Sequence, residues 1–319
     1  MAYLRALIAL FALVLAIPAM AAPVLARHVT VITLSTMLAD QGIGEWGYAA
    51  LVEVDGHRVL FDTGAHADVV LRNAADLHID LSTVEDVVIT HFHDDHTGGL
   101  LALRKAMMAK NPAALSRLHV GAGIMADRFD ARGHLDNGFP ALARAYVATG
   151  ATLIEHGAPV MLVPGLWLTG PVPRHHDETN FDTDEFVHTT TGAVVDPVAE
   201  DSSLVIATAD GSIIVTGCGH AGIMNIADAA QAITGDARLL AVIGGLHLFA
   251  KPDAVLVATA ARLKGLRYLL AGHCTGIEAT WRLRGLLGLD RHTAVVEAVG
   301  SRFVWGEAHP GIVAGDIAG

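Results

Sequence analysis

Three histidines and two aspartates stand within six consecutive positions, from His91 to His96, in the stretch HFHDDH. In an extended segment alternate side chains point the same way, so His91 and His93 can reach one ion together. Asp95 and His96 follow where the chain bends toward a helix, and they can serve a second ion beside the first. Imidazole and carboxylate groups are ligands that zinc and similar divalent metals accept. The residue types and their spacing therefore predict a metal site.

A strand must end and a helix must begin around this stretch. Residues 84–90, VEDVVIT, form a short apolar run that predicts a buried strand, and residues 97–109 have helical periodicity. Gly98 and Gly99 give the backbone freedom at the bend between them. Polar side chains at the carboxyl end of a strand are typical of the places where α/β proteins carry out chemistry.

The rest of the chain divides into two hairpin-rich halves that are each followed by helices. Residues 29–36 alternate as a strand does, and hairpins are predicted at 48–64 and 203–218, each turning at an Asp-Gly pair. Strand and helix patterns then alternate from 221 to 287. This rhythm predicts two sheets packed together with helices outside. The polar residues 174–192 are expected to form a loop over the site.

Composition restricts the class of partner. Hydrophobic residues make up 52% of the chain and charged residues 17%, which is typical of a folded protein with a large core. Acidic residues outnumber basic ones by 33 to 21, and the net charge is -12. A nucleic-acid-binding protein needs a basic surface, so we expect a small-molecule substrate and no nucleic acid.

The first residues are typical of a secretory signal peptide. Arg5 precedes an apolar run over 6–17, and the small-residue site Ala19-Met20-Ala21 follows. We expect cleavage after Ala21, a mature domain over 22–319 and a periplasmic or secreted location. An uncleaved anchor remains the alternative, although the run is short for a membrane span. After cleavage we expect no stable membrane insertion.

The two cysteines lie beside histidines. Cys218 is part of GCGH and Cys274 is part of GHCTG. In an oxidising compartment such a pair could form a disulfide. A role in metal binding or in the active site competes with that reading, and the sequence leaves both open.

The His-x-His-x-Asp-His pattern after an apolar strand resembles the metallo-β-lactamase superfamily. That resemblance implies an α/β (α+β) fold, a four-layer αβ/βα sandwich with a metal site along one edge. LFDTG also fits, with Asp62 matching a carboxylate that supports a ligand. The elements GCGHAG, GGLHLF and AGHCTG together are similar to the branch named after 7,8-dihydropterin-6-yl-methyl-4-(β-D-ribofuranosyl)aminobenzene 5′-phosphate synthase, from about Val29 to about Leu287.

The resemblance implies two divalent ions, zinc first, with manganese or iron as alternatives. Six side chains are the expected ligands, with the first three on one ion and the last three on the other: His91, His93, His220, Asp95, His96 and His273. Superfamily members carry a bridging aspartate where this chain has Cys218. Cys218 would bind as a thiolate or support the ligands from behind. The usual third-motif histidine has no clear match, although His175, His176 and His188 lie in that region.

An exported metal-dependent hydrolase is the function that these features favour. A metal-activated water would attack a phosphoester, a lactone or a related small molecule. Asp95, His247 or water would protonate the leaving group, and Arg174 would hold an anionic group of the substrate. The alternatives are a non-catalytic metal-binding or sensor protein and a synthase-type transferase as in the branch name. A di-iron oxidoreductase is disfavoured, because those relatives carry a carboxylate where this chain has His93.

Overall fold

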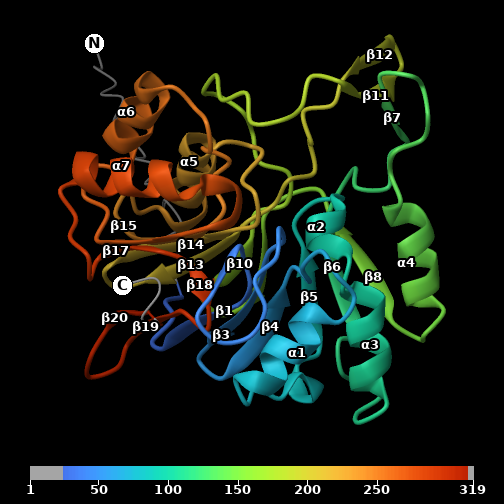
Figure 1. Ribbon diagram of the computed structural model, residues 1–319, viewed down its shortest axis with the longest axis horizontal. Helices are drawn as coiled ribbons and strands as arrows, with labels where there is room; N and C mark the ends of the chain where they lie inside the picture. The colour runs from blue at the N-terminus through green and yellow to red at the C-terminus, as the bar shows by residue number, and fades with distance from the viewer. Residues whose placement is uncertain (1–23, 315–319) are drawn as a thin grey trace, which may run out of the picture.

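Two β-sheets pack face to face in the computed structural model, which describes residues 24–314, and helices cover both outer faces (Figure 1). This is the predicted four-layer αβ/βα sandwich. The predicted signal peptide, residues 1–21, lies outside the described residues. Among residues 24–314, no helix has both the length and the apolar character that a membrane crossing requires.

The first sheet has eight strands in the order β20-β19-β1-β3-β4-β5-β6-β8. The predicted strand over 29–36 is β1, the first hairpin is β3–β4, and the strand before the histidine stretch is β5. The strands are β1 (Val29–Ser35), β3 (Ala49–Val54), β4 (His57–Phe61), β5 (Asp86–Ile89), β6 (Arg117–Gly121), β8 (Thr152–His156), β19 (Arg302–Trp305) and β20 (Gly311–Val313).

The second sheet has seven strands in the order β17-β16-β15-β14-β13-β10-β9. The strands are β9 (Val160–Val163), β10 (Leu166–Leu168), β13 (Leu204–Thr208), β14 (Gly211–Thr216), β15 (Leu239–Gly244), β16 (Tyr268–Ala271) and β17 (Ala294–Val296). The second predicted hairpin is β13–β14. Every residue of β13, β14 and β15 is buried, since these strands are covered on both faces, which explains their nearly continuous apolar sequence.

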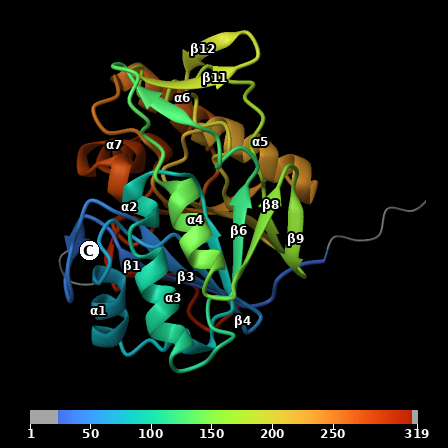
Figure 2. The same cartoon turned by 90° about the vertical axis from the view of Figure 1, so that its right-hand side faces the viewer.

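Helices α1, α3 and α4 cover the first sheet, and α5, α6 and α7 cover the second (Figures 1 and 2). The α-helices are α1 (Val69–Asp76), α2 (Asp94–Thr97), α3 (Leu100–Met108), α4 (Phe139–Val147), α5 (Ile223–Thr234), α6 (Asp253–Arg262) and α7 (Ile277–Leu287), with short 3-10 turns η1 (Leu81–Thr83) and η2 (His273–Thr275). Helices α5 and α7 each end at a glycine in the left-handed region, Gly235 and Gly288.

Three apolar clusters fill the spaces between the four layers. The central cluster joins the two sheets and includes Val31 and Phe61 from the first and Ile206 and Ile243 from the second. One outer cluster lies between the first sheet and its helices, and the other lies between the second sheet and its helices. Burial of this apolar area is the main force that holds the layers together.

The polar residues 174–192 differ in part from the expected loop. Residues Glu185–Thr189 form β11, which pairs with β12 (Gly192–Val195) and with β7 (Arg128–Asp130) in a small separate sheet. This flap, β7-β11-β12, projects from the body of the molecule (Figures 1 and 2). The sequence EFVHT lacks an apolar alternation, so the strand could not be recognised among the polar residues around it. The smallest sheet pairs β2 (Leu38–Ala39) with β18 (Ala298–Val299).

A charged cluster lies at the first residue of β5, away from the predicted site. The Asp86 carboxylate accepts hydrogen bonds from Arg117 Nε at 2.6 Å and His119 Nε2 at 3.0 Å, and His57 Nε2 lies 2.9 Å away. Burial alone would raise the pKa of Asp86, but its bonds to His119 and Arg117 outweigh that cost and lower it. Several of the numerous histidines thus have a structural role.

Candidate metal centre

Every predicted ligand follows the carboxyl end of a strand at one edge of the sandwich. The histidine stretch follows β5, and Asp62 follows the neighbouring β4. In the second sheet Cys218 and His220 follow β14, and His273 follows β16. Strands β4 and β5 run parallel, as do β14, β15 and β16, so their carboxyl ends meet at the same edge.

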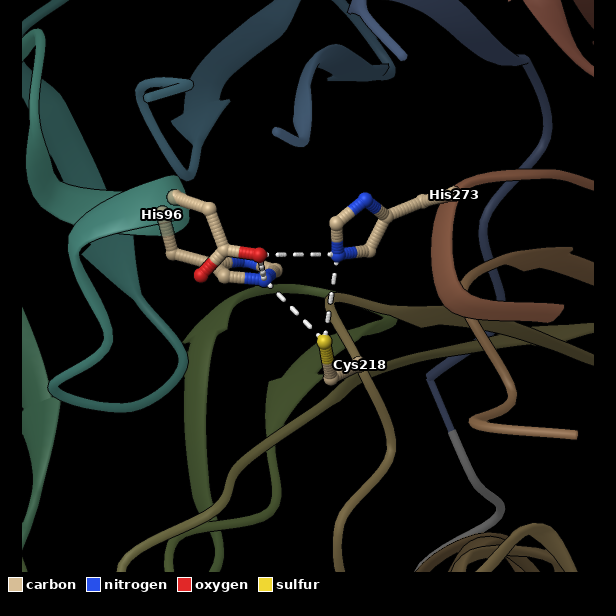
Figure 3. A group of neighbouring side chains, drawn as sticks. His96, Cys218 and His273 are labelled. Carbon is tan, nitrogen blue, oxygen red and sulfur yellow. Dashed lines mark hydrogen bonds and ion pairs between the residues drawn. The ribbon is translucent and has the colours of Figure 1, made fainter. Parts of the chain in front are cut away.

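Four side chains from three separate segments form the first group of possible ligands. The Sγ atom of Cys218 lies 3.2 Å from Nε2 of His96 and 3.2 Å from Nε2 of His273 (Figure 3). The Oδ2 atom of Asp95 lies 3.2 Å from Nε2 of His273 and 3.7 Å from Nε2 of His96. The ligand atoms of all four lie within 4.8 Å of one another. Such a set of sulfur, nitrogen and oxygen donors suits zinc.

A second group lies beside the first and shares Cys218 with it. It consists of His91, Cys218 and His220, whose ligand atoms also lie within 4.8 Å of one another. The imidazole rings of His91 and His220 are 4.6 Å apart, and His93 lies 4.8 Å from His220. The structure therefore brings together all six predicted ligands and places Cys218 between the two groups.

Asp62 and Thr90 hold two of the histidines from behind. Asp62 Oδ2 accepts hydrogen bonds from Nδ1 of His96 at 2.7 Å and from the Thr90 hydroxyl at 2.9 Å. Since that hydroxyl donates to Asp62, it accepts from Nδ1 of His91 at 2.9 Å. When neutral, both histidines thus carry their proton on Nδ1, and their Nε2 lone pairs face the cluster. Asp62 lies where the sequence placed it, beneath the ligands.

Several lone pairs in the cluster lack a protein donor. His220 donates from Nδ1 to the carbonyl oxygen of Asn180, and its buried Nε2 has no partner among residues 24–314. The Cys218 thiol has one proton, yet it faces Nε2 of both His96 and His273. A divalent cation would satisfy these lone pairs at once, so the side chains present fit a metal centre.

The protonation behaviour of the cluster is strongly perturbed. Burial, followed by the neighbouring histidines, lowers the pKa of His91 and of His220 well below the ordinary value. For His96, burial acts in the same direction, but the carboxylates of Asp95 and Asp62 outweigh it and raise the pKa to about 9. Burial raises the pKa of the Cys218 thiol. A buried thiolate at this position therefore requires a nearby cation.

Three residues at the site adopt backbone conformations that L-residues usually avoid. Asp62, His247 and His273 have φ values of 55°, 50° and 48°. Such conformations cost energy and persist where the surrounding structure enforces them, as at ligand and catalytic positions. Both cysteines are buried free thiols in this structure, with no disulfide between Cys218 and Cys274.

The remaining predicted residues lie in different places. His247 lines the cavity, 4.7 Å from the ring of His220, and its Nδ1 has no partner among the described residues. Arg174 does not line the cavity. Its guanidinium donates to the main-chain carbonyls of His220 at 2.8 Å and of Val198 at 3.1 Å. The substrate-binding role that its residue type suggested finds no support in this position, which instead holds the His220 loop.

The histidines near the third-motif position turn away from the centre. His176 pairs with Asp228 at 2.8 Å, and the ring of His188 packs against Phe129 on the flap. Neither of them lines the cavity, nor does His175. His220, from the following motif, stands with the ligand group instead.

The cavity above the cluster has a volume of about 340 Å³ and is bordered by residues that the sequence did not single out. They are Trp46, Phe92, Asp94, Asp136, Asp182, Glu185 and Phe249. The expectation that residues 174–192 cover the site is confirmed, because Asp182 and Glu185 come from that segment. Trp46 and Phe249, the two exposed aromatic residues among them, occur singly in loops, and no spacing pattern could have revealed them.

Comparison with known proteins gives consistent results. The sequence profile of the metallo-β-lactamase superfamily matches residues 47–240. The 7,8-dihydropterin-6-methyl-4-(β-D-ribofuranosyl)-aminobenzene-5′-phosphate synthase of Methanocaldococcus jannaschii is 30% identical over 266 residues, which cover 79% of this chain and 89% of that protein. The solved structure of Tm1679, a metal-dependent hydrolase of the β-lactamase superfamily, has a TM-score of 0.65 at 25% identity and covers 86% of this chain and 98% of its own. YhfI from Bacillus subtilis shares the fold, with a TM-score of 0.54 at 12% identity over 87% of this chain and 99% of its own.

Proposed function

The chain belongs to the metallo-β-lactamase superfamily, in the branch that includes the Methanocaldococcus synthase, and we propose that it is a dinuclear metal-dependent hydrolase. One observation carries the proposal: two adjacent groups of possible ligands share Cys218, so that this residue could serve an ion in either group. His96, His273 and Asp95 would complete one site. His91 and His220, with His93 beside them, would complete the other.

Zinc is the metal that the donor set favours. The shared sulfur ligand and the surrounding imidazoles suit zinc better than magnesium or calcium, which prefer oxygen. Manganese and iron are the alternatives. When bound, the ions would lower the pKa of a coordinated water and polarise the group that it attacks.

The protein's own residues would orient the metal ligands and protonate the leaving group. Asp62 and Thr90 keep the proton of His96 and of His91 on Nδ1, so that both Nε2 lone pairs face the centre. His247 is the better placed of the two candidate proton donors, because its unpartnered Nδ1 belongs to a residue that lines the cavity. The Asp95 carboxylate is already engaged by His273 and His96.

Metal analysis combined with turnover tests this proposal. We expect the purified protein to hold two equivalents of zinc and to hydrolyse at least one member of a panel of chromogenic phosphodiesters, lactones and aryl esters. His220→Ala should lose one equivalent and at least about a hundredfold in kcat/KM. His292→Ala, which changes an exposed histidine far from the centre, should retain both. A fully metal-loaded protein that turns over no substrate on the panel would favour a metal-binding or sensor function.

A synthase-type reaction is the second candidate, and the likeness to the M. jannaschii protein over most of both chains favours it. The two candidates differ in what they consume. A synthase would require two organic substrates and would release a condensed product, whereas a hydrolase would act on one substrate and water. Mass spectrometry of products formed from a dihydropterin with a leaving group, such as diphosphate, on its 6-methyl carbon and an aminobenzene ribofuranosyl phosphate would detect both the condensed product and the released leaving group.

Export is a separate proposal that rests on residues 1–21 alone. We propose that this segment directs the protein out of the cytoplasm and is removed after Ala21. Expression of the full chain in a bacterial host, followed by fractionation and intact-mass analysis, should find a periplasmic species that begins at residue 22. A full-length species in the membrane fraction would support the anchor alternative.

A further inference from the structure

The cavity has an aromatic wall at the end where His273 lies. Trp46 and Phe249 are half exposed, their rings are in edge-to-face contact at 6.0 Å, and the Trp46 ring lies 5.1 Å from the ring of His273. Phe249 also contacts the ring of His247 at 5.9 Å. Large aromatic side chains that remain exposed at the mouth of a cavity provide a surface for a flat apolar group.

The part of the cavity beside His93 has an acidic wall. Glu185 Oε2 lies 3.6 Å from Nε2 of His93, and Asp94, Asp136 and Asp182 line the same cavity. Burial and the neighbouring carboxylates, Glu185 foremost, raise the pKa of Asp136, which is consistent with their mutual proximity. Asp136 and Glu185 come from the flap and its connection.

A buried histidine with an unpartnered ring nitrogen also lines this cavity. His220 is 1% exposed, its Nε2 has no partner among the described residues, and it lines the same cavity between the walls. The rings follow one another from His273 through His96 and His91 to His93, at centroid distances of 5.0, 4.2 and 4.5 Å. Trp46 therefore lies beside the first histidine of this row and Glu185 beside the last.

Among the residues that the structure describes, no lysine or arginine lines this cavity. Arg128 is buried in ion pairs with Asp196 and Glu200, and Arg174 is bound to main-chain carbonyls. Two divalent cations would bring four positive charges, fewer than the five carboxylates that line the cavity. Proteins that bind phosphate or carboxylate groups usually supply arginine or lysine for them, and this cavity supplies neither.

We propose that the cavity accepts an elongated small molecule with a flat apolar group at one end and a cationic or amine-bearing group at the other. This inference rests on the proposed function, because the bond to be cleaved would lie over the histidines between the two walls. The apolar group would pack on Trp46 and Phe249, and the cationic group would face Asp136, Asp182 and Glu185. A substrate that carries an anionic group at the acidic end, such as a phosphate monoester, would be disfavoured.

Binding of three matched ligands to the zinc-loaded protein tests the proposal without turnover. Phenethylamine, 2-phenylethanol and 2-phenylethanesulfonate share a ring and spacer and differ in charge, and none of them has a carboxylate that would favour zinc. Isothermal titration calorimetry should give the tightest binding for the amine, with a dissociation constant at least about tenfold below that of the sulfonate, because opposite-sign interactions with several carboxylates add. Equal affinities, or tighter binding of the sulfonate, would overturn the proposal.

Charge-removing variants locate the effect. The double variant Asp136→Asn/Asp182→Asn should weaken binding of phenethylamine about three- to tenfold and leave binding of 2-phenylethanol unchanged. Asp76→Asn removes an exposed carboxylate at the end of α1, outside the cavity, and should change neither. Trp46→Leu should weaken all three ligands similarly, since they share the ring. If the amine preference survives the double variant, the acidic wall does not recognise the ligand.

The outcome is separable from that of the proposed function. Charge-selective binding without hydrolysis of any panel substrate would leave the ligand class standing and would contradict the hydrolase. Hydrolysis without charge-selective binding would support the hydrolase and contradict the proposed ligand class.

Discussion

Replacing Asp62 with asparagine tests whether the centre depends on the carboxylate beneath it. Asp62 has a φ of 55°, a left-handed conformation that asparagine tolerates well, so the backbone should be retained. Asp62 Oδ1 accepts from the main-chain N–H of Thr90 at 2.9 Å, and Oδ2 accepts from the Thr90 hydroxyl and from Nδ1 of His96. An amide has only one oxygen for these two sides.

Either orientation of the asparagine side chain breaks the arrangement. If its NH₂ group faces Thr90, two donors oppose each other at the main chain. If its NH₂ group faces His96, Nδ1 must accept a hydrogen bond, so the ring hydrogen moves to Nε2, which loses the lone pair that would bind an ion. Loss of one charge-assisted hydrogen bond costs about 1.5–3 kcal/mol, which corresponds to roughly a 10- to 150-fold weaker affinity for the ion that His96 would hold.

Competition between the protein and a chromophoric zinc chelator measures both affinities. We expect the affinity of one site to fall about 10- to 100-fold in Asp62→Asn, and that of the other site to fall less, because His91 depends on Asp62 only through Thr90. Asp76→Asn is the matched control, and circular dichroism would show that the fold is retained. If a folded Asp62→Asn protein keeps both affinities within about threefold of the parent, the supporting role assigned to Asp62 is wrong.

Three further predictions concern stability. Asp86→Asn should lower the free energy of unfolding at pH 7 by about 2 kcal/mol, as measured in urea titrations. The pKa of Asp86 is lower in the folded state than in the unfolded state. The stabilisation by its carboxylate is therefore complete above the unfolded pKa of about 3.9 and should fade as the pH drops below that value. Arg117→Met, which removes one of its partners, should reproduce part of the loss at pH 7. Gly217→Ala would place a methyl carbon 2.5 Å from Oδ2 of Asp62. It should lower the free energy of unfolding by about 1–3 kcal/mol and also weaken zinc binding. A fully stable variant would show that the loop can shift. Arg174→Met should lower the free energy of unfolding by about 1–3 kcal/mol in thermal or urea denaturation, because it leaves main-chain carbonyls without donors. If stability is unchanged and KM is raised, Arg174 binds the substrate.

Local patterns determined much of the fold. The β3–β4 and β13–β14 hairpins, strand β5 and helices α3, α5 and α7 agree with the sequence predictions, because side-chain periodicity and turn residues act over a few neighbouring positions. Strand β11 was missed, because on the flap it buries little of either face and its sequence lacks an apolar alternation. The flap sheet is held by pairing with β7, which is more than fifty residues earlier in the chain.

The sequence by itself determined the chemistry available to this protein: the residue types at 91–96, 218, 220 and 273, and their positions after strands. Only the tertiary structure decided that Cys218 stands between two groups of donors, since 122 residues separate it from His96 and 55 from His273. It also decided that Arg174 supports a loop and that aromatic and acidic walls face one cavity. Such distances depend on strand register and on the packing of one sheet against the other, which no local pattern of residues encodes.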